Sequence, residues 1–547
     1  MFDLMDRTGL GVPAGKLRWV AWLRVAALCF GWVAAPAWAQ AQGDGRFDIL
    51  EYRIEGNSLL PEREVALAVT PHLGEALSLQ DVEAARSALE KRYHDAGFLT
   101  VLVSIPEQQV DGGVVGLLVT EASVSRLRVA GAQYHLPSAI RERMPPVAEG
   151  TVPNFNALQQ SLGEINRSAD LKVTPVLKPG RTPGTVEVQL DVDDQLPLHG
   201  QVDVSNRQSA NTTATRLGAS LRYDNLWQRG HSLGLTLQTS PEAPEQTQLL
   251  SLNYLWPMGP NGTALTLYAV TSRSEFATLY NAPGLGVLGN NDILGLRYAM
   301  PLGDALGYAQ TLSLGLDIKK NLQSLRFAGV DTPSPAVTYA PLTLAYRGVW
   351  LNDQPQPSTL DVSATLGVRG LLGNGDAAFE AKRAGASANY SALRSTLQLY
   401  RAMARWQWGA RLEWQAASGP LLPSEQFSAG GADSVRGFLE GERAGDQAVR
   451  LSFELTSPGV KLPLGKGDWR MTGLAFVDEA WLNTHQAGVG QAGDTSLAGA
   501  GLGMRLTGPA GLGVQLDAAR ALTDGDVAGG GTRRGDWRLH GRVSLEF

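Results

Sequence analysis

The C-terminal stretch Trp537-Arg538-Leu539-His540-Gly541-Arg542-Val543-Ser544-Leu545-Glu546-Phe547 alternates apolar and polar residues and ends the chain on an aromatic side chain. Successive side chains of a β-strand point to opposite faces of its sheet. One face of this strand therefore carries Trp537, Leu539, Val543, Leu545 and Phe547. Strands between lipid and water show this pattern, but strands of soluble sandwiches do too, so one such segment does not decide the class.

The same alternation recurs in sixteen successive segments after residue 197, and no helical pattern separates them. Each segment is close to the length of about 9–11 residues with which a tilted strand crosses a bilayer. Their predicted positions are 198–205, 215–223, 232–239, 247–256, 263–271, 293–300, 310–319, 341–350, 360–369, 391–400, 405–415, 448–456, 469–478, 499–506, 512–519 and 537–547. The sequence therefore predicts a membrane β-barrel of 16 antiparallel strands over residues 197–547.

The connections between these segments alternate in length. If the preceding residues lie in the periplasm, the connections on the periplasmic side are short, such as 257–262 and 401–404. Several of the others are long, and 416–447 is the longest. Short periplasmic turns opposite long surface loops are typical of outer-membrane barrels. The inward faces also carry many charged residues, which predicts a wet lumen, as in a solvated porin wall.

The N-terminus resembles a secretory signal over residues 1–39. An apolar stretch from Val25 to Val33 is followed by a small-x-small cleavage site at Ala37-Trp38-Ala39. Lys16, Arg18 and Arg24 precede this stretch. Cys29, the one cysteine of the chain, lies inside this segment. The mature chain would therefore have no thiol, which excludes disulfides and cysteine chemistry.

Residues 47–121 and 122–196 each show the order strand, helix, helix, strand, strand. In the first of these modules, Ser78 precedes a helix with Leu79, Val82, Leu89 and Tyr93 on one face, and Gly97 follows where a helix stop belongs. Tandem modules of this order resemble POTRA domains, periplasmic modules that hold unfolded clients by adding a strand to a sheet edge. A pair of unrelated α+β domains is the alternative.

The predicted sixth surface loop contains Gly430-Gly431-Ala432-Asp433-Ser434-Val435-Arg436-Gly437-Phe438. Strand thirteen contains Phe476-Val477-Asp478-Glu479-Ala480, and its alternation places Phe476 and Asp478 inward. In both motifs the chain resembles the two-partner secretion translocators (TpsB, the haemolysin secretion/activation family of the POTRA-barrel superfamily). Their hallmark tetrad is matched by Val435, Arg436, Gly437 and Phe438. Their strand motif ends in glycine, where this chain has Ala480.

The resemblance implies a translocator in the bacterial outer membrane with its POTRA-like modules in the periplasm. Its expected partners are a large exported β-rich protein, outer-membrane lipid and, during biogenesis, the barrel-assembly machinery, with Phe547 as the C-terminal assembly signal. We expect Arg436 and Asp478 to pair in the lumen; in the alternative, Asp478 pairs with Arg450 or Arg505. About seven residues separate Ala39 from Phe47, too few for the plug helix of many family members, so either the plug is missing or the signal assignment is wrong.

Other functions were weighed against this prediction. A barrel-assembly insertase of the same superfamily and a passive porin are the alternatives. An enzyme is not expected, because the barrel histidines His199, His231, His485 and His540 show no paired acidic or serine spacing. A GxGxxG string at 284–289 lies in a predicted loop with no helix after it. We expect no catalytic residue, cofactor, metal or nucleic-acid partner.

Overall fold

The computed structural model describes residues 46–259, 262–273, 276–278, 286–288, 290–305, 307–322, 325–327, 330–332, 336–351, 356–465, 467–488 and 492–547. The described chain divides into two compact units, one of residues 46–92 and 103–119 and the other of residues 93–102 and 120–547. The predicted signal, residues 1–39, and residues 284, 285 and 289 of the GxGxxG string lie outside the described residues. No helix within the described ranges is long and apolar enough to cross a membrane.

The first module has five strands where its sequence predicted three, because the predicted strand at 47–55 is divided into two and one further strand is present. Its elements are β1 (Phe47–Ile49), β2 (Glu51–Glu55), α1 (Glu62–Val69), η1 (Thr70–His72), β3 (Gly74–Leu77), α2 (Leu79–Asp95), β4 (Val101–Ser104) and β5 (Val114–Glu121). β2, β5 and β4 form a sheet in that order, while β3, which was not predicted, pairs with β1. β3 has four residues and a left-handed backbone at Ala76 (φ 56°), so it shows no readable alternation.

Helix α2 is largely as predicted. Val82, Leu89 and Tyr93 are fully buried on one face. Leu79 was placed on that face but is 66% exposed, because it is the first helical residue and lies at the edge of the apolar stripe. Gly97 has φ 97°, and the N–H of Phe98 donates to the carbonyl of Tyr93 at 2.9 Å, which is the hydrogen bond of a glycine-terminated helix.

The second module follows the predicted order. Its elements are β6 (Ser123–Ala130), α3 (Pro137–Glu142), η2 (Pro145–Val147), α4 (Phe155–Ile165), β7 (Leu171–Pro179) and β8 (Thr185–Asp194), with sheet order β6-β8-β7. The Asn154 side chain caps α4 by accepting the N–H of Ala157 at 3.1 Å. Apolar residues of both helices and all three strands form one core, which includes Ile140, Leu158 and Leu190.

The carboxylate of Asp194 fastens the end of β8 to the loop after β6. It accepts the backbone N–H groups of Gln133, Tyr134 and His135, each at 2.8 Å, and its side chain is fully buried. Burial raises the pKa of Asp194, but these hydrogen bonds together hold that pKa below its ordinary value. The ionised carboxylate is therefore the form that stabilises the module.

We expect Asp194→Ala to lower the local stability of this module by about 3 kcal/mol, because three buried N–H groups lose their acceptor. Amide hydrogen exchange of residues 123–135 in the full chain should accelerate by roughly 100-fold. Asp193→Ala, which removes the neighbouring exposed carboxylate, serves as the control and should change nothing. Because the folded pKa is depressed, the stabilisation is complete above the unfolded pKa of about 3.9 and is lost as the pH falls through the folded pKa. Equal protection in both variants would contradict this role.

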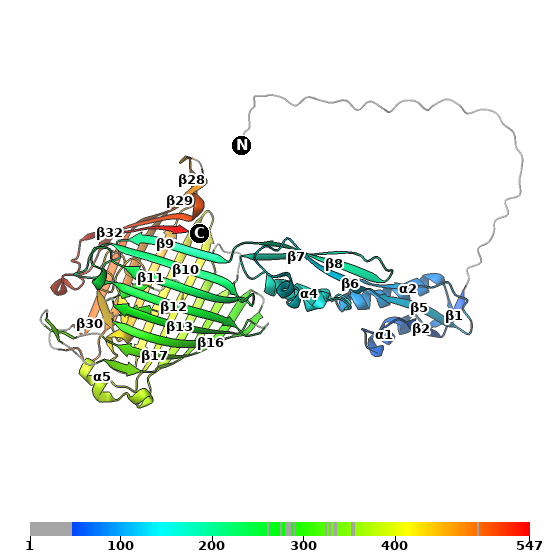
Figure 1. Ribbon diagram of the computed structural model, residues 1–547, viewed down its shortest axis with the longest axis horizontal. Helices are drawn as coiled ribbons and strands as arrows, with labels where there is room; N and C mark the ends of the chain where they lie inside the picture. Colours follow the sequence, from blue (N-terminus) through cyan, green and yellow to red (C-terminus); the bar gives the residue numbers. More distant parts are fainter. Residues whose placement is uncertain are drawn as a thin grey trace, which may run out of the picture. The chain divides into compact units, whose positions relative to one another are not determined.

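The predicted barrel of sixteen antiparallel strands is confirmed (Figure 1). Its strands are β9 (Leu198–Ser205), β10 (Arg216–Leu226), β11 (His231–Thr239), β12 (Gln248–Pro257), β13 (Ala264–Arg273), β16 (Asn291–Ala305), β17 (Tyr308–Asn321), β21 (Leu342–Trp350), β22 (Ser358–Leu366), β23 (Ser391–Met403), β24 (Trp406–Ala417), β27 (Gln447–Thr456), β29 (Trp469–Asn483), β30 (Asp494–Thr507), β31 (Leu512–Ala521) and β32 (Trp537–Glu546). Every predicted segment corresponds to one of these strands.

Shorter elements accompany the barrel strands. β20 (Val337–Tyr339) pairs with β17 beyond the end of β21, and β28 (Val460–Leu462) pairs with β29 beyond the end of β27. The loops contain the two-stranded pairs β14 (Phe276–Thr278) with β15 (Gly286–Leu288), β18 (Leu325–Phe327) with β19 (Val330–Thr332), and β25 (Phe427–Ala429) with β26 (Arg443–Gly445). They also contain α5 (Asp376–Lys382), η3 (Pro244–Gln246), η4 (Leu371–Gly373), η5 (Pro423–Glu425), η6 (Pro509–Gly511) and η7 (Val527–Gly529).

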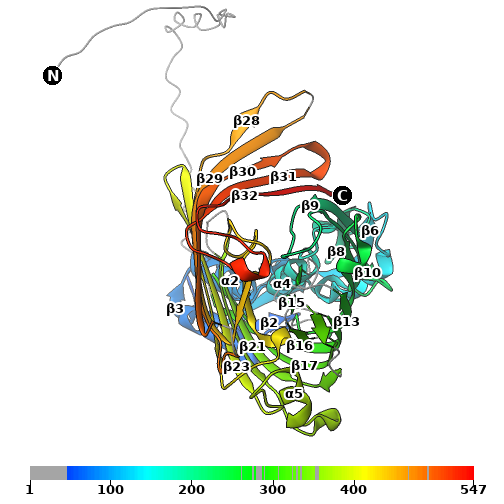
Figure 2. The same ribbon diagram turned by 90° about the vertical axis from the view of Figure 1, so that its left-hand side faces the viewer.

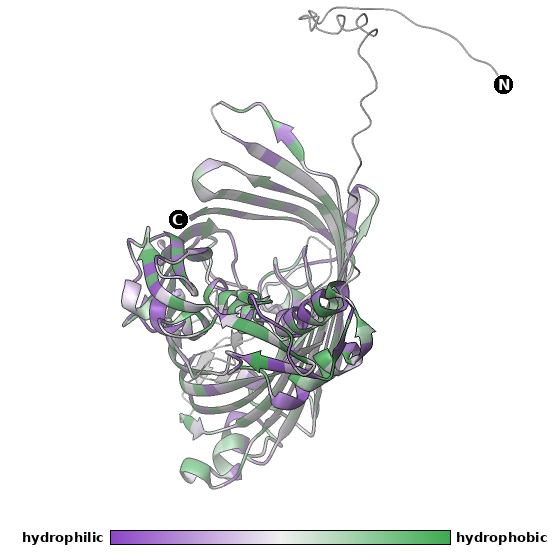
Figure 3. Ribbon diagram, turned by 90° about the vertical axis from the view of Figure 1, so that its right-hand side faces the viewer, coloured by the Kyte–Doolittle hydropathy of each residue, from purple (hydrophilic) through white to green (hydrophobic). Residues whose placement is uncertain are grey.

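The two faces of the barrel wall differ as the alternation predicted, and Figure 3 shows hydrophilic and hydrophobic residues alternating along the strands. On β29, Val477 is 53% exposed, whereas Phe476 and Asp478 are buried. The five apolar residues of the last strand pattern are all exposed on the outer face, where lipid covers them. Charged lumen residues lie in ion pairs, for example Arg297 with Asp317 and Arg505 with Asp517.

The first and last strands close the barrel (Figure 2). β32 ends at Glu546, and Phe547 continues the pairing through two backbone hydrogen bonds with Gly200, at 2.8 and 2.9 Å. A Cβ at position 200 would lie 2.2 Å from the Phe547 ring, so glycine leaves the space that this ring fills. At the other end of the pairing, the side chain of Asn206 bonds the backbone of β32 at Leu539 and Gly541, at 2.6 and 2.8 Å.

Candidate functional site

The predicted sixth surface loop folds into the barrel. Its stem is the β25–β26 pair, which places residues 430–442 at the tip (the loop 6 tip). Gly430 and Gly431 open the tip with φ of 110° and 108°, a backbone that side-chain-bearing residues rarely adopt. The tip contacts inward-facing residues of β27, β29 and β32, so it lies in the lumen.

Arg436 at the tip forms the predicted pair with Asp478 on β29. Its Nε donates to Oδ2 at 2.7 Å and its Nη2 donates to Oδ1 at 2.8 Å, while its backbone N–H reaches Oδ2 at 3.1 Å. Its Nη1 also donates to Glu454 Oε1 on β27 at 2.6 Å. Arg436 is 4% exposed and Asp478 is fully buried. Bidentate pairing of this kind fixes both distance and orientation.

Other residues of the barrel wall contact the Arg436 guanidinium or its carboxylate partner. The Arg436 Cζ lies 3.4 Å from the centroid of the Phe476 ring, a cation–π contact with the first residue of the strand motif. Ser452 donates to Asp478 Oδ1 at 2.6 Å. The alternative pairing is wrong, because Arg450 binds Glu413 at 2.7 Å and Arg505 binds Asp517.

Apolar residues on either side of Arg436 anchor the tip further. Val435 and Phe438 are fully buried in a cluster that includes Ala480, Leu482 and Leu497 of the wall. Ala480, which replaces the family's glycine, is itself fully buried in this cluster, so its methyl group adds to the apolar contact. The departure from the motif is therefore compatible with a docked loop.

Two further contacts connect the tip to the strands that close the barrel, and the sequence pattern did not reveal them. Arg207, two residues beyond the end of β9, pairs with Asp433, with Nη2 and Oδ1 2.7 Å apart. The N–H of Gly437 donates to Nε2 of His540 on β32 at 3.0 Å. Gly437 has φ 101°, and its Cα passes so close to β31 that a Cβ would lie 3.2 Å from the backbone of Arg520 and Ala521.

Gly499 on β30 was also missed by the sequence prediction. A Cβ there would lie 1.9 Å from the carbonyl oxygen of Arg436, so only glycine lets the tip approach this strand. Gly501, two positions along the same face, leaves room for the Phe476 ring, at 2.7 Å from a Cβ built there. Glycines at alternate positions of a strand are the signal that was available, since they mark a close approach of another chain segment.

Glu442, at the far end of the tip, joins it to the last surface loop. Its carboxylate accepts the N–H groups of Leu439 at 2.8 Å, Asp526 at 3.0 Å and Thr532 at 2.6 Å. It also accepts the Thr532 hydroxyl at 2.8 Å. Nothing in the sequence distinguished this glutamate from its neighbours, because its partners in the last surface loop lie 84 and 90 residues further along the chain.

Two family models match this chain. The model described as haemolysin secretion/activation protein ShlB/FhaC/HecB matches residues 184–506, and the model described as POTRA domain, ShlB-type, matches residues 47–122. The chain belongs to the haemolysin secretion/activation family. As a member, it is an outer-membrane translocator of two-partner secretion, with its POTRA-type region in the periplasm. The family favours this function over the insertase and the porin.

Individual relatives agree with the family. The outer membrane transporter CdiB of Dickeya dadantii (strain 3937) is 24% identical over 453 residues, which cover 80% of this chain and 77% of that protein. Among solved structures, CdiB from Escherichia coli has a TM-score of 0.62 at 19% identity and covers 94% of this chain and 93% of its own. BamA from Haemophilus ducreyi lacking POTRA domains 1-3 has a TM-score of 0.52 at 15% identity, covering 92% and 100%. At these identities the structural likenesses show the fold alone.

Proposed function

We propose that the translocator passes a large exported β-rich partner protein, unfolded, through its lumen, and that the loop 6 tip is the gate that this partner displaces. The observation that carries the proposal is the docking of Arg436, which joins the loop to two carboxylates on the inward wall. A buried arginine needs such partners, so the docked position is well defined. The contacts are all non-covalent, so a client that supplies its own contacts to the wall can replace them.

Residues 47–121 and 122–196 act as two periplasmic POTRA-like modules that receive the client before it enters the barrel, which comprises residues 197–547. Each module has a three-stranded sheet whose outer strands, β2 and β4 or β6 and β7, have a neighbour on one side within that sheet. An extended client segment can add to such an edge through backbone hydrogen bonds. Residues 1–39 serve as the export signal and are removed.

The remaining expectations fit this role. The apolar outer face of the barrel contacts outer-membrane lipid, and Phe547 is recognised by the barrel-assembly machinery during biogenesis. Folding of the partner at the cell surface drives its export. The protein has no enzymatic activity of its own, uses no cofactor and binds no nucleic acid.

The gate is tested by tethering the loop 6 tip where it is docked. Arg207→Cys and Asp433→Cys place two thiols at positions whose side chains pair in the structure. A short bismaleimide with a cleavable disulfide would join them in cells that also express the partner. We expect secretion of the partner to stop on cross-linking and to resume after cleavage of the linker.

Each single-cysteine variant, treated with the same reagent, is the control for loss of the ion pair and for modification alone. Mature wild-type chain has no cysteine once the predicted signal is removed, which keeps the labelling specific. Undiminished secretion from chains that are quantitatively cross-linked would show that the loop 6 tip need not move, and would refute the gate.

A further inference from the structure

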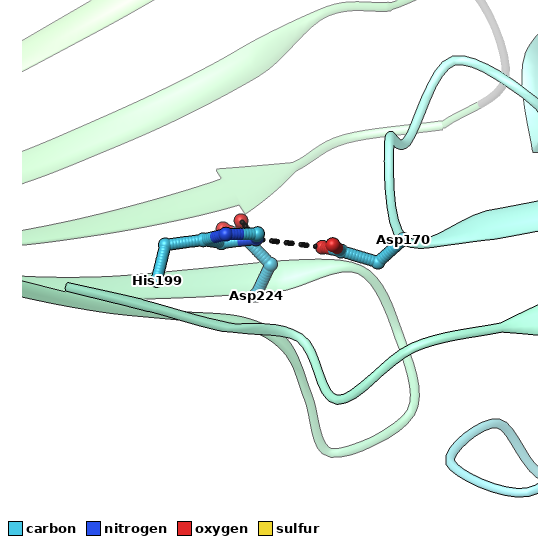
Figure 4. Close-up of side chains that lie close together, drawn as sticks. All are labelled: Asp170, His199 and Asp224. Atoms are coloured by element: carbon cyan, nitrogen blue, oxygen red, sulfur yellow. Dashed lines mark hydrogen bonds and ion pairs between the residues drawn. The ribbon is translucent and has the colours of Figure 1, made fainter. Parts of the chain in front are cut away.

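A histidine and two aspartates meet where the second module joins the first two barrel strands (Figure 4). His199 is the second residue of β9, Asp224 lies near the end of β10, and Asp170 immediately precedes β7. All three belong to the same compact unit. Their ligand atoms lie within 4.8 Å of one another. The sequence shows no acidic residue at a paired spacing from His199, and the two aspartates meet it only in the fold, because one comes from β10 and the other from the second module.

The backbone fixes each of the three positions. In the antiparallel pairing of β9 with β10, His199 lies opposite Arg222, so Asp224, two residues further, shares its face. The N–H of Asp224 donates to the carbonyl of Pro197 at 2.8 Å. The carbonyl of Asp170 accepts the N–H of Gln195 at 2.9 Å, which ties Asp170 to the segment that leads into β9.

Both carboxylates approach the same ring nitrogen of His199. Nε2 lies 2.9 Å from Asp170 Oδ2 and 3.6 Å from Asp224 Oδ2. A neutral imidazole has at most one proton to donate at Nε2. A hydrogen bond to one carboxylate therefore leaves the other carboxylate without a donor from this ring nitrogen. Asp170 is 5% exposed, and two carboxylates this close repel each other unless a cation lies between them.

The two distances from His199 Nε2 are close to the spacing of ligands around one metal ion. With ligand bonds of about 2.0–2.2 Å, neighbouring ligand atoms of a tetrahedral or octahedral ion lie roughly 3–3.5 Å apart. One imidazole with two carboxylates is a donor set for Zn²⁺ and its neighbours in the first transition row, whereas Mg²⁺ and Ca²⁺ prefer oxygen ligands alone.

Arg222 also contacts the cluster, and its position is compatible with a bound ion. Its Nε donates to Asp224 Oδ2 at 3.0 Å. A carboxylate oxygen has two lone pairs, so Oδ2 can accept from Arg222 and still bind a metal. Hydrogen bonds of this kind commonly orient the carboxylates that bind metals.

We propose that Asp170, His199 and Asp224 bind a divalent transition-metal ion that fastens the second module to β9 and β10. Two ligands belong to the barrel and one to the module, so the ion would restrain the segment 195–197 that connects them. This function is separate from the gate, because none of the three residues contacts the loop 6 tip in the hydrogen bonds and ion pairs of the described residues.

The test uses the full chain in detergent, freed of metal with a chelator and titrated with Zn²⁺ alone by calorimetry. His199→Gln and Asp224→Asn remove one ligand each with little change of shape. His231→Gln is the matched control, since His231 lies on the next strand, β11, and belongs to no such cluster. We expect one Zn²⁺ site per wild-type chain that is retained in His231→Gln and weakened by more than about 100-fold in the two ligand variants.

Hydrogen exchange of residues 195–199 supplies a second readout. Zn²⁺ should slow exchange there in the wild type and in His231→Gln, and have no effect in His199→Gln. Folding of each variant is checked by the heat-dependent gel mobility of its barrel. The proposal is overturned if Zn²⁺ binds all four proteins equally, or if it binds none of them.

Discussion

Arg436→Ala is expected to reduce secretion of the partner protein by at least about tenfold while the barrel still inserts. Removing this side chain leaves Asp478, which is fully buried, without its bidentate partner. Breaking a buried ion pair costs about 3–5 kcal/mol. Since about 1.4 kcal/mol equals a factor of ten, the ratio of docked to undocked loop should fall by roughly 100-fold or more. The released tip exposes Val435 and Phe438, which then collapse onto other lumen surfaces and obstruct the client.

Two measurements separate gate failure from assembly failure. Heat-dependent gel mobility reports the folded barrel and should match the wild type. Conductance in planar bilayers should become noisier, because an undocked tip no longer holds one position. Arg436→Lys keeps the charge but cannot pair in bidentate fashion. Its secretion of the partner should therefore lie between that of the wild type and that of Arg436→Ala. Normal secretion from Arg436→Ala would refute a role for the pair in translocation.

Gly499→Val is expected to have the same effect without touching any charge. A Cβ at this position would lie 1.9 Å from the carbonyl oxygen of Arg436. This oxygen belongs to the backbone, so it cannot move away as the end of a flexible side chain would. Valine suits a β-strand, so the barrel itself should form. The loop 6 tip must therefore leave its place against β30, and secretion should again fall by at least about tenfold for an overpacking cost of more than about 1.4 kcal/mol.

Ala500→Val is the matched control, because the neighbouring residue of the same strand points to the opposite face. It adds the same side chain on the lipid side and should secrete normally. Protease sensitivity of residues 430–442 on intact cells measures undocking directly and should rise in Gly499→Val only. A Gly499→Val barrel with a protected tip and normal secretion would show that β30 does not limit the docked position.

The strand pattern predicted the barrel correctly, because the two faces of each strand lie in different solvents. Lipid on one side and water on the other impose the period-two alternation on each crossing strand, so all sixteen could be found separately. The same alternation placed Phe476 and Asp478 inward, and the loop motif supplied Arg436 as the expected partner. The prediction failed for β3 and for Leu79, where short length and a position at the edge of a helix face weaken any periodic signal.

The sequence by itself determined the barrel, its strand count, the inward face of β29 and the pair of motifs that meet there, because each depends on local alternation or on a contiguous run of residues. Only the tertiary structure decided what surrounds the loop 6 tip: Arg207 against Asp433, His540 under Gly437, Glu442 with the last surface loop, and Gly499 as the space for a carbonyl. It alone brought Asp170 and Asp224 to His199. These residues lie on different strands, loops and modules, and only the tertiary fold, which no local pattern encodes, brings them together.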